Sequence, residues 1–268
     1  MSVPSARRRR ITRPPAVLLV VATLGLALFL IPLVGLLART PWSDLGELLV
    51  ADVARDALRL SLVTSLVSAA ICALVGVPLA WVLARLDFWG RSLARGIVTL
   101  PLVLPPVVGG AALLFAFGRR GLIGEPIYEA TGLLLPFSGW GVILADTFVA
   151  MPFLVLVVEG GLRNLDGRYE LAAATLGAGR WRVFRTVTLP LIRGSLAAGL
   201  VLAWARALGE FGATITFAGN LQGRTQTMPL AVFVALERDR DAAVALSLVL
   251  VAVSLTILVV LRDRWRAP

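Results

Sequence analysis

The chain has 268 residues, 58% of them hydrophobic, and a formal net charge of +10. All 26 basic residues are arginines, which excludes the phosphate-binding lysine of a G-x-x-x-x-G-K-[ST] loop and any Schiff-base lysine. The absence of histidine and the single cysteine exclude His-based catalytic triads, multi-cysteine metal sites and an internal disulfide. This composition is typical of a polytopic membrane protein and not of a soluble enzyme.

Six apolar stretches are long enough to cross a membrane, because a helix needs about 20 apolar residues to span a hydrocarbon core about 30 Å thick. The sequence therefore predicts an all-α integral membrane protein with six transmembrane helices. We place them at Ala16–Ala38, Leu60–Leu83, Ile97–Phe117, Trp140–Val158, Gly194–Ala218 and Ala242–Leu261. An arginine-rich leader (1–15) precedes the first helix (16–38), and the main transmembrane domain covers 58–262, with its longest inner loop at 160–193.

The first helix is expected to remain in the protein as an anchor. Its charge-free stretch, Pro14–Ala38, is longer than the apolar core of about 7–15 residues found in cleaved signal peptides. No small-x-small cleavage site followed by a soluble domain accompanies it. We therefore expect a retained membrane helix.

Arginine placement predicts the orientation, because short cytoplasmic loops collect positive charge. The N-terminal segment, the loop around Arg85–Arg95, the loop Arg163–Arg193 and the tail after Leu261 hold five, three, six and three arginines. The three other loops hold three, two and three. Six helices with both chain ends in the cytoplasm satisfy this asymmetry. The positive charge is thus a topology signal, and we expect no nucleic acid partner.

The third predicted helix contains three prolines within Leu100–Gly110. Proline removes a backbone donor and clashes with the preceding turn, so we expect a kink or break, with Pro105 and Pro106 near it. Lipid tolerates a break only where neighbouring helices or a watery cavity satisfy the freed carbonyl groups. The break is therefore either a packing kink or part of the lining of a pore.

The inner loop 160–193 has more apolar residues than a connector needs. Residues 171–176 favour a short helix, Gly177 and Gly179 permit a turn, and residues 181–187 form a second amphipathic turn that Pro190 ends. Apolar side chains that face the cytosol indicate a surface for a partner. A basic amphipathic segment can instead lie on lipid, and at this point both interpretations stay open.

The same loop resembles the cytoplasmic signature of binding-protein-dependent ABC importer permeases, E-A-A-x3-G-x9-I-x-L-P. The matching positions are Ala172, Ala173, Gly177, Val187, Leu189 and Pro190, with valine in place of isoleucine. The sequence departs from the signature at Leu171, which occupies the glutamate position, while Glu170 stands one residue earlier. The resemblance implies a type I ABC importer transmembrane domain whose loop forms coupling helices that seat in a cleft of an ATP-binding subunit. It also implies that Ala172, Ala173 and Gly177 make close contacts there and that Glu170 is a polar anchor.

The fifth predicted helix carries Arg206 and Glu210 near the middle of the membrane. They are four residues apart and therefore share one face of a helix. Ionisable groups at that depth are costly unless they are paired or face water, so they indicate a function by default. The alternative is a neutralising ion pair that locks two helices together. Arginine before glutamate is the less favourable order within one helix, so we expect partners on other helices.

The run Leu208–Phe217, together with Leu102–Pro106, Gly118–Gly121 and Gly223–Pro229, resembles permeases of the molybdate and sulfate branch of this family. Leu208–Phe217 is more similar to the molybdate members than to the sulfate members. The resemblance extends from Leu58 to Leu261 and implies import of a tetrahedral oxyanion through a water-filled path. The candidate path and gate residues are Arg206, Gly209, Glu210, Gly212, Thr214, Thr216, Pro105 and Pro106.

The resemblance also implies the partners: a second copy, two ATP-binding subunits inside, a molybdate-binding protein outside, and lipid of the bacterial cytoplasmic membrane. The chain itself is expected to be a transport subunit, not an enzyme, and to bind no cofactor, because ATP and Mg²⁺ belong to the ATP-binding subunits. Tungstate is a possible second substrate, and sulfate or thiosulfate is the alternative. Two other classes stay open: an ion-coupled secondary transporter that uses Asp146, Arg206 and Glu210 as a relay, and a membrane scaffold without transport.

Overall fold

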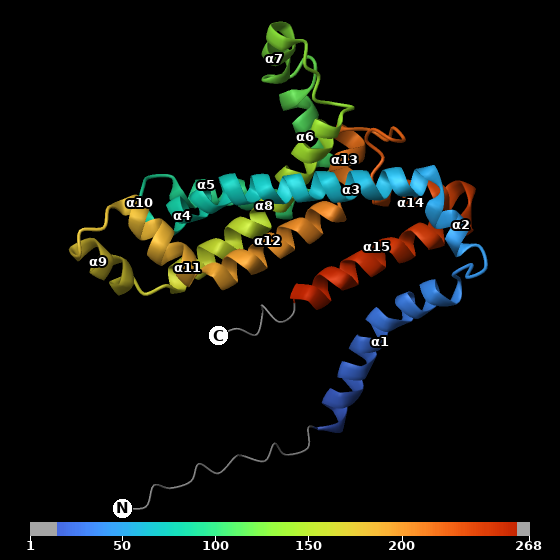
Figure 1. Ribbon diagram of the computed structural model, residues 1–268, viewed down its shortest axis with the longest axis horizontal. Helices are drawn as coiled ribbons and strands as arrows, with labels where there is room; N and C mark the ends of the chain where they lie inside the picture. Colours follow the sequence, from blue (N-terminus) through green and yellow to red (C-terminus); the bar gives the residue numbers. More distant parts are fainter. Residues whose placement is uncertain (1–14, 262–268) are drawn as a thin grey trace, which may run out of the picture.

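The computed structural model describes residues 15–261, which form helices and connecting segments without strands (Figure 1). Nearly all of the leader (1–14) and the tail (262–268) lie outside the described residues, and so does the prediction that both ends are cytoplasmic. The elements are α1 (Ala16–Ala38), α2 (Leu45–Val50), α3 (Asp52–Ile71), the π-helix η1 (Cys72–Gly76), α4 (Val77–Arg85), α5 (Arg91–Thr99), the 3-10 helix η2 (Leu100–Leu102), α6 (Pro106–Phe117), α7 (Gly124–Thr131), α8 (Gly139–Asn164), α9 (Arg168–Thr175), α10 (Arg180–Val183), the π-helix η3 (Phe184–Thr188), α11 (Leu189–Leu191), α12 (Arg193–Leu208), α13 (Gly212–Phe217), α14 (Met228–Arg238) and α15 (Arg240–Leu261).

Four predicted membrane helices are present as long apolar helices. They are α1, the continuous run Asp52–Arg85, α8, and Arg240–Ile257 of α15. Two more spans arise when each of two bent helix pairs is counted as one, so the described residues hold four to six candidate spans. The all-α membrane architecture is confirmed, and the number six depends on the bent pairs. Three short helices, α2, α7 and α14, occupy segments predicted as outer loops.

The third predicted helix is broken, as its prolines indicate. Its two halves, Arg91–Leu102 and α6, are bent by 116°. Pro105 lies at the N-cap of α6 with an extended ψ of 132°, and Pro106 is the first helical residue, where the missing N–H has no partner to lose. The bend turns α6 and α7 sideways, so that they project from the bundle as an arm (Figure 1).

The fifth predicted helix is not continuous, so the expectation of one helix over Gly194–Ala218 is wrong. α12 ends at Leu208, and Gly209 and Phe211 have non-helical backbone angles before α13 begins. Glycine has a low helix propensity, and the carboxylate of Glu210 accepts the N–H of Ala213, which starts a new helix there. At its other end, α12 is bent by 75° against Arg180–Leu191.

The core of the molecule surrounds α8, which packs against α12, α3 and α4. The largest cluster of buried residues includes Cys72, Leu154, Val158 and Ala203. A Cβ on Gly199 of α12 would lie 3.3 Å from the carbonyl oxygen of Leu154, so this glycine lets the two helices approach closely. In a membrane, such close packing contributes more than apolar burial, because lipid is as apolar as leucine.

Buried hydroxyl groups of α3 connect it to three other helices. The Oγ of Ser61 accepts the first N–H of α14 at 2.7 Å, and that of Ser65 accepts the indole N–H of Trp204 at 3.0 Å. The hydroxyl of Ser68 donates to the carbonyl of Ile143 at 3.0 Å. Hydrogen bonds of this kind join helices where neither water nor lipid can satisfy the polar atoms.

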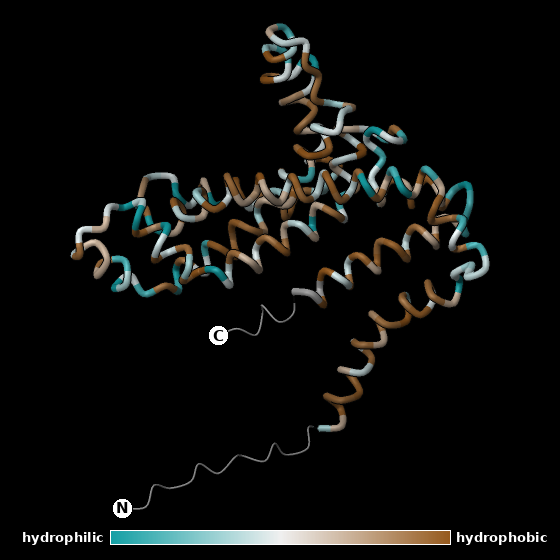
Figure 2. Tube along the Cα trace, viewed as in Figure 1, coloured by the Kyte–Doolittle hydropathy of each residue, from teal (hydrophilic) through white to brown (hydrophobic). Residues whose placement is uncertain are grey.

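The first helix, α1, stands apart from this bundle. None of its residues is buried, and its main contact is with α15. Figure 2 shows hydrophobic residues along almost the whole of this helix. A helix that is hydrophobic all round fits a position in lipid or against another membrane protein.

Candidate functional site

The predicted coupling loop lies at one end of the bundle, beyond the ends of α4 and α8 (Figure 1). It consists of α9, α10, η3 and α11, which fold on one another. Asp166 starts this unit, because its Oδ1 accepts the backbone N–H of Arg168 at 3.0 Å and so satisfies a free donor at the start of α9. The loop is therefore an ordered helical element and not an irregular connector.

Glu170 holds α9 against the bundle. Its Oε2 lies 3.0 Å from Nη2 of Arg85 at the end of α4, and its Oε1 accepts a 2.6 Å hydrogen bond from the hydroxyl of Thr188. Thr188 lies in η3 and is buried. A carboxylate in the first turn of a helix is also favoured by the helix dipole. Glu170 thus anchors the loop to its own chain; contact with an ATP-binding subunit stays a prediction.

Gly177 ends α9 in a backbone conformation that favours glycine. Its φ is +86°, its N–H binds the carbonyl of Ala174 at 3.0 Å, and the next N–H, of Ala178, binds the carbonyl of Ala173 at 3.1 Å. This pair of bonds is the Schellman motif, in which the left-handed residue is usually glycine. A Cβ at Gly177 would meet nothing within 4 Å, so the requirement comes from the backbone and not from crowding.

The loop presents an apolar surface to solvent. Leu171 and Leu176 are 66% and 89% exposed, and Ala172 and Gly177 are exposed as well. We call these four residues the docking face. Exposed apolar side chains on one helical unit indicate a partner surface.

The remaining signature residues connect the loop to the membrane part. Ala173 and Val187 are half-buried, and Leu189 packs against the main core cluster. Pro190 is exposed in the first turn of α11, directly before α12. The signature therefore has two parts, one at the docking face and one at the joint with α12.

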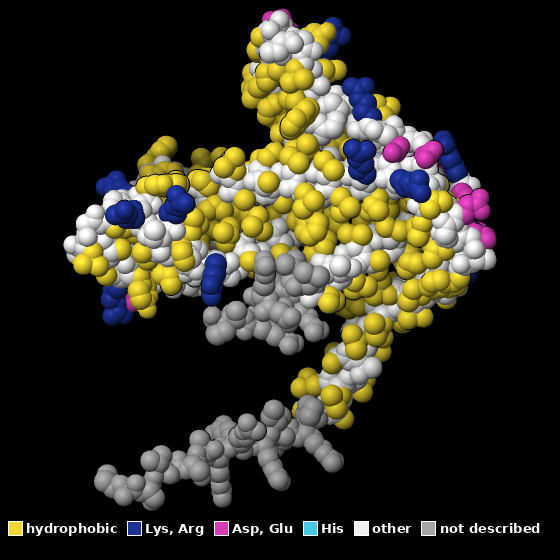
Figure 3. All heavy atoms as spheres, viewed as in Figure 1, with side chains coloured by type: hydrophobic (Ala, Val, Ile, Leu, Met, Phe, Trp, Pro, Cys, Tyr) yellow, Lys and Arg dark blue, Asp and Glu magenta, His cyan; other side chains and the backbone are white. Residues whose placement is uncertain are grey.

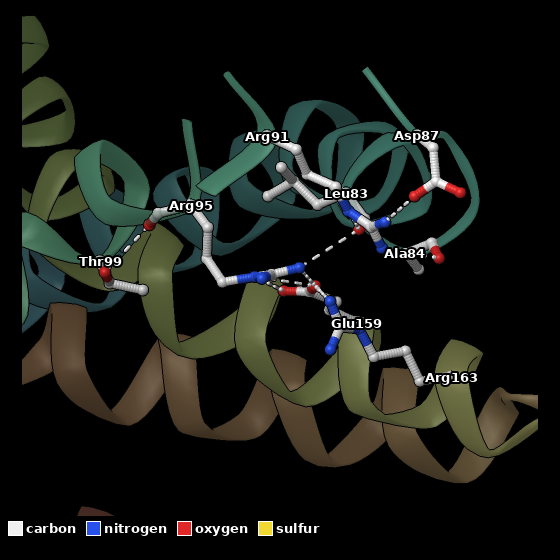
Figure 4. A network of polar contacts seen from close by, with 8 residues as sticks. All are labelled: Leu83, Ala84, Asp87, Arg91, Arg95, Thr99, Glu159 and Arg163. Carbon is white, nitrogen blue, oxygen red and sulfur yellow. Dashed lines mark hydrogen bonds and ion pairs between the residues drawn. The ribbon is translucent and has the colours of Figure 1, made fainter. Parts of the chain in front are cut away.

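A second polar network lies beside the loop and fastens α5 to α8 (Figure 4). The buried carboxylate of Glu159 pairs with Arg95 at 2.5 Å and with Arg163 at 2.9 Å. Arg163 is in the last turn of α8, just before the loop. Arg91 donates to the carbonyl of Leu83 at 2.8 Å and so ties the start of α5 to the end of α4. The end of α8 is thereby tied to α5, the first half of the broken helix.

Several candidate path residues meet where α6 packs against α13. A Cβ on Gly212 would lie 2.7 Å from Cβ of Pro106, and a Cβ on Gly110 would lie 2.7 Å from Cβ of Thr216. Side chains larger than hydrogen do not fit these contacts without a shift. The hydroxyl of Thr216 donates to the carbonyl of Gly212 at 2.8 Å, and Pro105 is exposed just before α6.

The charged pair of the fifth segment is made within that segment. Oε2 of Glu210 lies 2.5 Å from Nη2 of Arg206, and its Oε1 accepts the N–H of Ala213 at 2.8 Å. Glu210 is buried, whereas Gly209 beside it is exposed. The described residues do not provide the partners on other helices that the sequence analysis expected. Glu210 neutralises Arg206 and caps α13, so it connects the two halves of the broken segment.

Thr214 lies inside the packing of α13 against α8. Its hydroxyl is 3.5 Å from Oδ1 of Asp146, and both side chains are buried. Thr216, two residues further on, is partly exposed. In one copy of the chain, Thr216 is therefore nearer to an accessible surface than Thr214.

Sequence reasoning missed several residues of these networks. They are Arg85, Arg95, Glu159, Arg163 and Thr188. The spacing of Glu159 and Arg163, four residues apart at the inner end of a helix, was a readable signal. Arg95 and Glu159 are 64 positions apart, and no local pattern joins them. Within residues 15–261 no three His, Cys, Asp or Glu side chains form a group that could hold a metal ion.

Comparison with known proteins gives concordant matches. Residues 76–266 match the family described as binding-protein-dependent transport system inner membrane component. The chain is 48% identical over 215 residues to the molybdenum transport system permease protein ModB of Mycobacterium tuberculosis, which covers 80% of each chain. It is 36% identical over 213 residues to the sulfate transport system permease protein CysT of Escherichia coli, covering 78% of this chain and 76% of the relative.

The fold is similar to that of a solved transporter. The structure is that of a bacterial alginate ABC transporter in complex with an alginate pentasaccharide-bound periplasmic protein. The TM-score is 0.76 at 18% identity, and the match covers 94% of each chain. The family match over most of the sequence and this fold agree with the helical coupling loop. The chain therefore belongs to the binding-protein-dependent inner membrane components, the permease subunits of ABC importers.

Proposed function

We propose that this permease imports molybdate across the bacterial cytoplasmic membrane. Two copies form the path, two ATP-binding subunits dock on the loops, and an external molybdate-binding protein delivers the ion. The assignment of molybdate as the substrate rests on sequence identity. The chain is 48% identical to a molybdenum permease and 36% identical to a sulfate permease over nearly the same length. Tungstate, an oxyanion of the same shape and charge, is expected to share the path.

Energy coupling is needed because the substrate is a dianion. An inside-negative potential opposes its entry by about 2.3 kcal/mol per charge per 100 mV, so uptake against a gradient requires work. The chain has no lysine for a phosphate-binding loop, and it therefore takes this work from the ATP-binding subunits. The docking face is the surface that receives it.

The contacts of the loop suggest how movement reaches the path. The Glu170–Arg85 pair links α9 to α4, and the Glu159–Arg95 pair links the end of α8 to α5. α5 continues through η2 to α6, which packs against α13. When ATP binding brings the two ATP-binding subunits together, the coupling loops of the two permease copies approach each other. α6 and α13 then change their relative position. Weak contacts along the path then let the ion leave.

The test is uptake by the complete importer in proteoliposomes. We expect ATP-dependent uptake of labelled molybdate that excess tungstate reduces strongly and excess sulfate reduces little. Preferential competition by sulfate would show that the substrate is sulfate or thiosulfate. This is the second candidate, and the 36% identity to CysT supports it. Uptake by the permease alone, driven by an ion gradient without ATP, would contradict the pump and favour a secondary transporter.

The path is tested separately with Glu210→Ala and Glu210→Gln. Both remove the charge that neutralises Arg206, and only alanine also removes the side-chain acceptor for α13. We expect lower molybdate uptake for both variants, while the complex with the ATP-binding subunits persists. If Glu210→Gln transports normally, the charge is not required for transport, and the cap is the remaining role of the side chain.

A further inference from the structure

An apolar groove lies between the end of α4 and the segment that follows the docking face. Its volume is about 280 Å³, and it is open to the surface. It is lined by Pro78, Trp81, Val82, Arg180, Trp181 and Phe184. None of these residues belongs to the path or to the ion-pair networks described above.

Aromatic rings form the walls of the groove. The rings of Trp81 and Phe184 meet edge to face with centroids 6.4 Å apart, and Trp181 stacks on Phe184 at 5.6 Å. Trp181 and Phe184 are thereby fixed against α4, and the groove has an ordered wall. Apart from Arg180, every lining residue is apolar or aromatic.

Arg180 lines the groove, and the segment that it begins is positively charged. The segment 180–193 contains Arg180, Arg182, Arg185 and Arg193 and no acidic residue. All four are exposed, and none forms an ion pair with another residue of the described range. Figure 3 shows arginine side chains beside hydrophobic surface at the end of the molecule that carries α9 and α10.

With the coupling loop in the cytoplasm, the groove would lie at the level of the inner membrane surface. Pro78, Trp81 and Val82 belong to the last two turns of the long span that ends at Arg85, next to the coupling loop. Tryptophan is enriched at this level, and basic pockets between helices on the cytoplasmic side bind lipid head groups. An occupant must combine an apolar body with an anionic head.

We propose that this groove binds one anionic phospholipid of the inner leaflet. An acyl chain lies along the wall that Trp81 and Phe184 form, and the phosphate is held by Arg180 and Arg182. The lipid fills the space between α4 and α10 and steadies the segment that joins the docking face to α12. The site rests on the loop being cytoplasmic, but it does not depend on which oxyanion is transported.

The experiment uses the permease in complex with its ATP-binding subunits in nanodiscs of phosphatidylcholine. A trace of phosphatidylglycerol with a photoreactive acyl chain is added, and the labelled peptides are identified by mass spectrometry. We expect labelling within 78–82 and 181–184, competed by unlabelled phosphatidylglycerol and not by further phosphatidylcholine.

Arg180→Gln and Arg182→Gln should each lower labelling about fivefold, the effect of one arginine at an anionic surface. Arg120→Gln, an exposed arginine of an outer loop, is the matched control and should change nothing.

A second variant tests the cavity independently of charge. Val82→Trp fills the groove from the half-buried face of α4 and should abolish labelling without loss of assembled complex. Equal labelling by photoreactive phosphatidylcholine, or labelling unchanged in Val82→Trp, would overturn the site. So would disulfide cross-links of Trp181→Cys to a second copy or to an ATP-binding subunit, since a protein would then cover the groove. Molybdate uptake is measured in parallel, and its absence would contradict the proposed function while leaving the labelling result intact.

Discussion

The two ends of the proposed transmission route are held together by different forces. At the loop end, three ion pairs join Arg85 to Glu170 and both Arg95 and Arg163 to Glu159. Where α6 meets α13, glycines bring backbones together. Ion pairs can persist through small changes in helix position and can transmit movement between elements, whereas the glycine contacts depend only on the size of the side chain. The comparison therefore predicts that substitutions that remove a charge act at the loop end. Substitutions that add side-chain volume should act where α6 meets α13.

The largest effect is expected from Glu159→Ala. It removes the buried carboxylate that two guanidinium groups share, and because these groups are 31% and 47% exposed and can be solvated, the cost is about 2–3 kcal/mol. The thermal unfolding midpoint in detergent should fall by roughly 6–10 °C. Glu125→Ala, an exposed glutamate of α7, is the control and should leave the midpoint unchanged. A shift no larger than that of the control would remove Glu159 from the network that holds α5.

Gly110→Ala tests the other end. Its Cβ would lie 2.8 Å from the carbonyl oxygen of Ala213 and 2.7 Å from Cβ of Thr216, so α6 and α13 must separate at a cost of about 2 kcal/mol. Unfolding and molybdate uptake are both measured. Gly96→Ala is the matched control, because a Cβ there meets nothing within 4 Å and alanine favours the helix. If both variants behave alike, close packing is not what joins the arm to the bundle.

Gly177→Ala is expected to have a smaller effect, confined to the loop. A side chain in the left-handed conformation costs about 1–2 kcal/mol, which weakens the end of α9 and the docking face. Co-purification with the ATP-binding subunit should fall, while membrane insertion is unchanged. Gly179→Ala, whose φ is −65°, is the control. Gly177→Asp should abolish the complex, and retained complex with full activity would contradict the docking assignment.

The smallest effect on stability is expected from Glu170→Gln. The ion pair with Arg85 is partly exposed, so its loss should cost about 0.5–1 kcal/mol, and the amide oxygen can still accept from Thr188. The change should appear instead in coupling, as a lower ratio of molybdate transported to ATP hydrolysed. Glu170→Ala also loses the bond to Thr188 and should lower that ratio further. An unchanged ratio in both variants would show that this contact only supports the loop.

The same contrast explains how much the sequence could predict. Features that act locally could be read from the sequence. The long apolar runs predicted the spans, the prolines at 105 and 106 predicted the break, and the glycine at 177 predicted the turn in the loop. The size of the 116° bend could not be read, because contacts between distant elements decide it. The end of α12 at Leu208 was missed, although Gly209 and the hydrogen bond between Glu210 and Ala213 mark it locally. The network of Arg95 and Glu159 joins distant positions, and it becomes visible only when α5 lies on α8. The signature predicted an anchor at Glu170, but only the fold gives its partners.

The isolation of α1 has a consequence for biogenesis. α1 shares almost no buried surface with the helices that follow it, so those helices can pack together without it. We expect α1 instead to help set the direction in which the later segments insert into the bilayer. A chain that begins at Pro41 should therefore fail by inserting in the wrong direction, rather than by failing to pack.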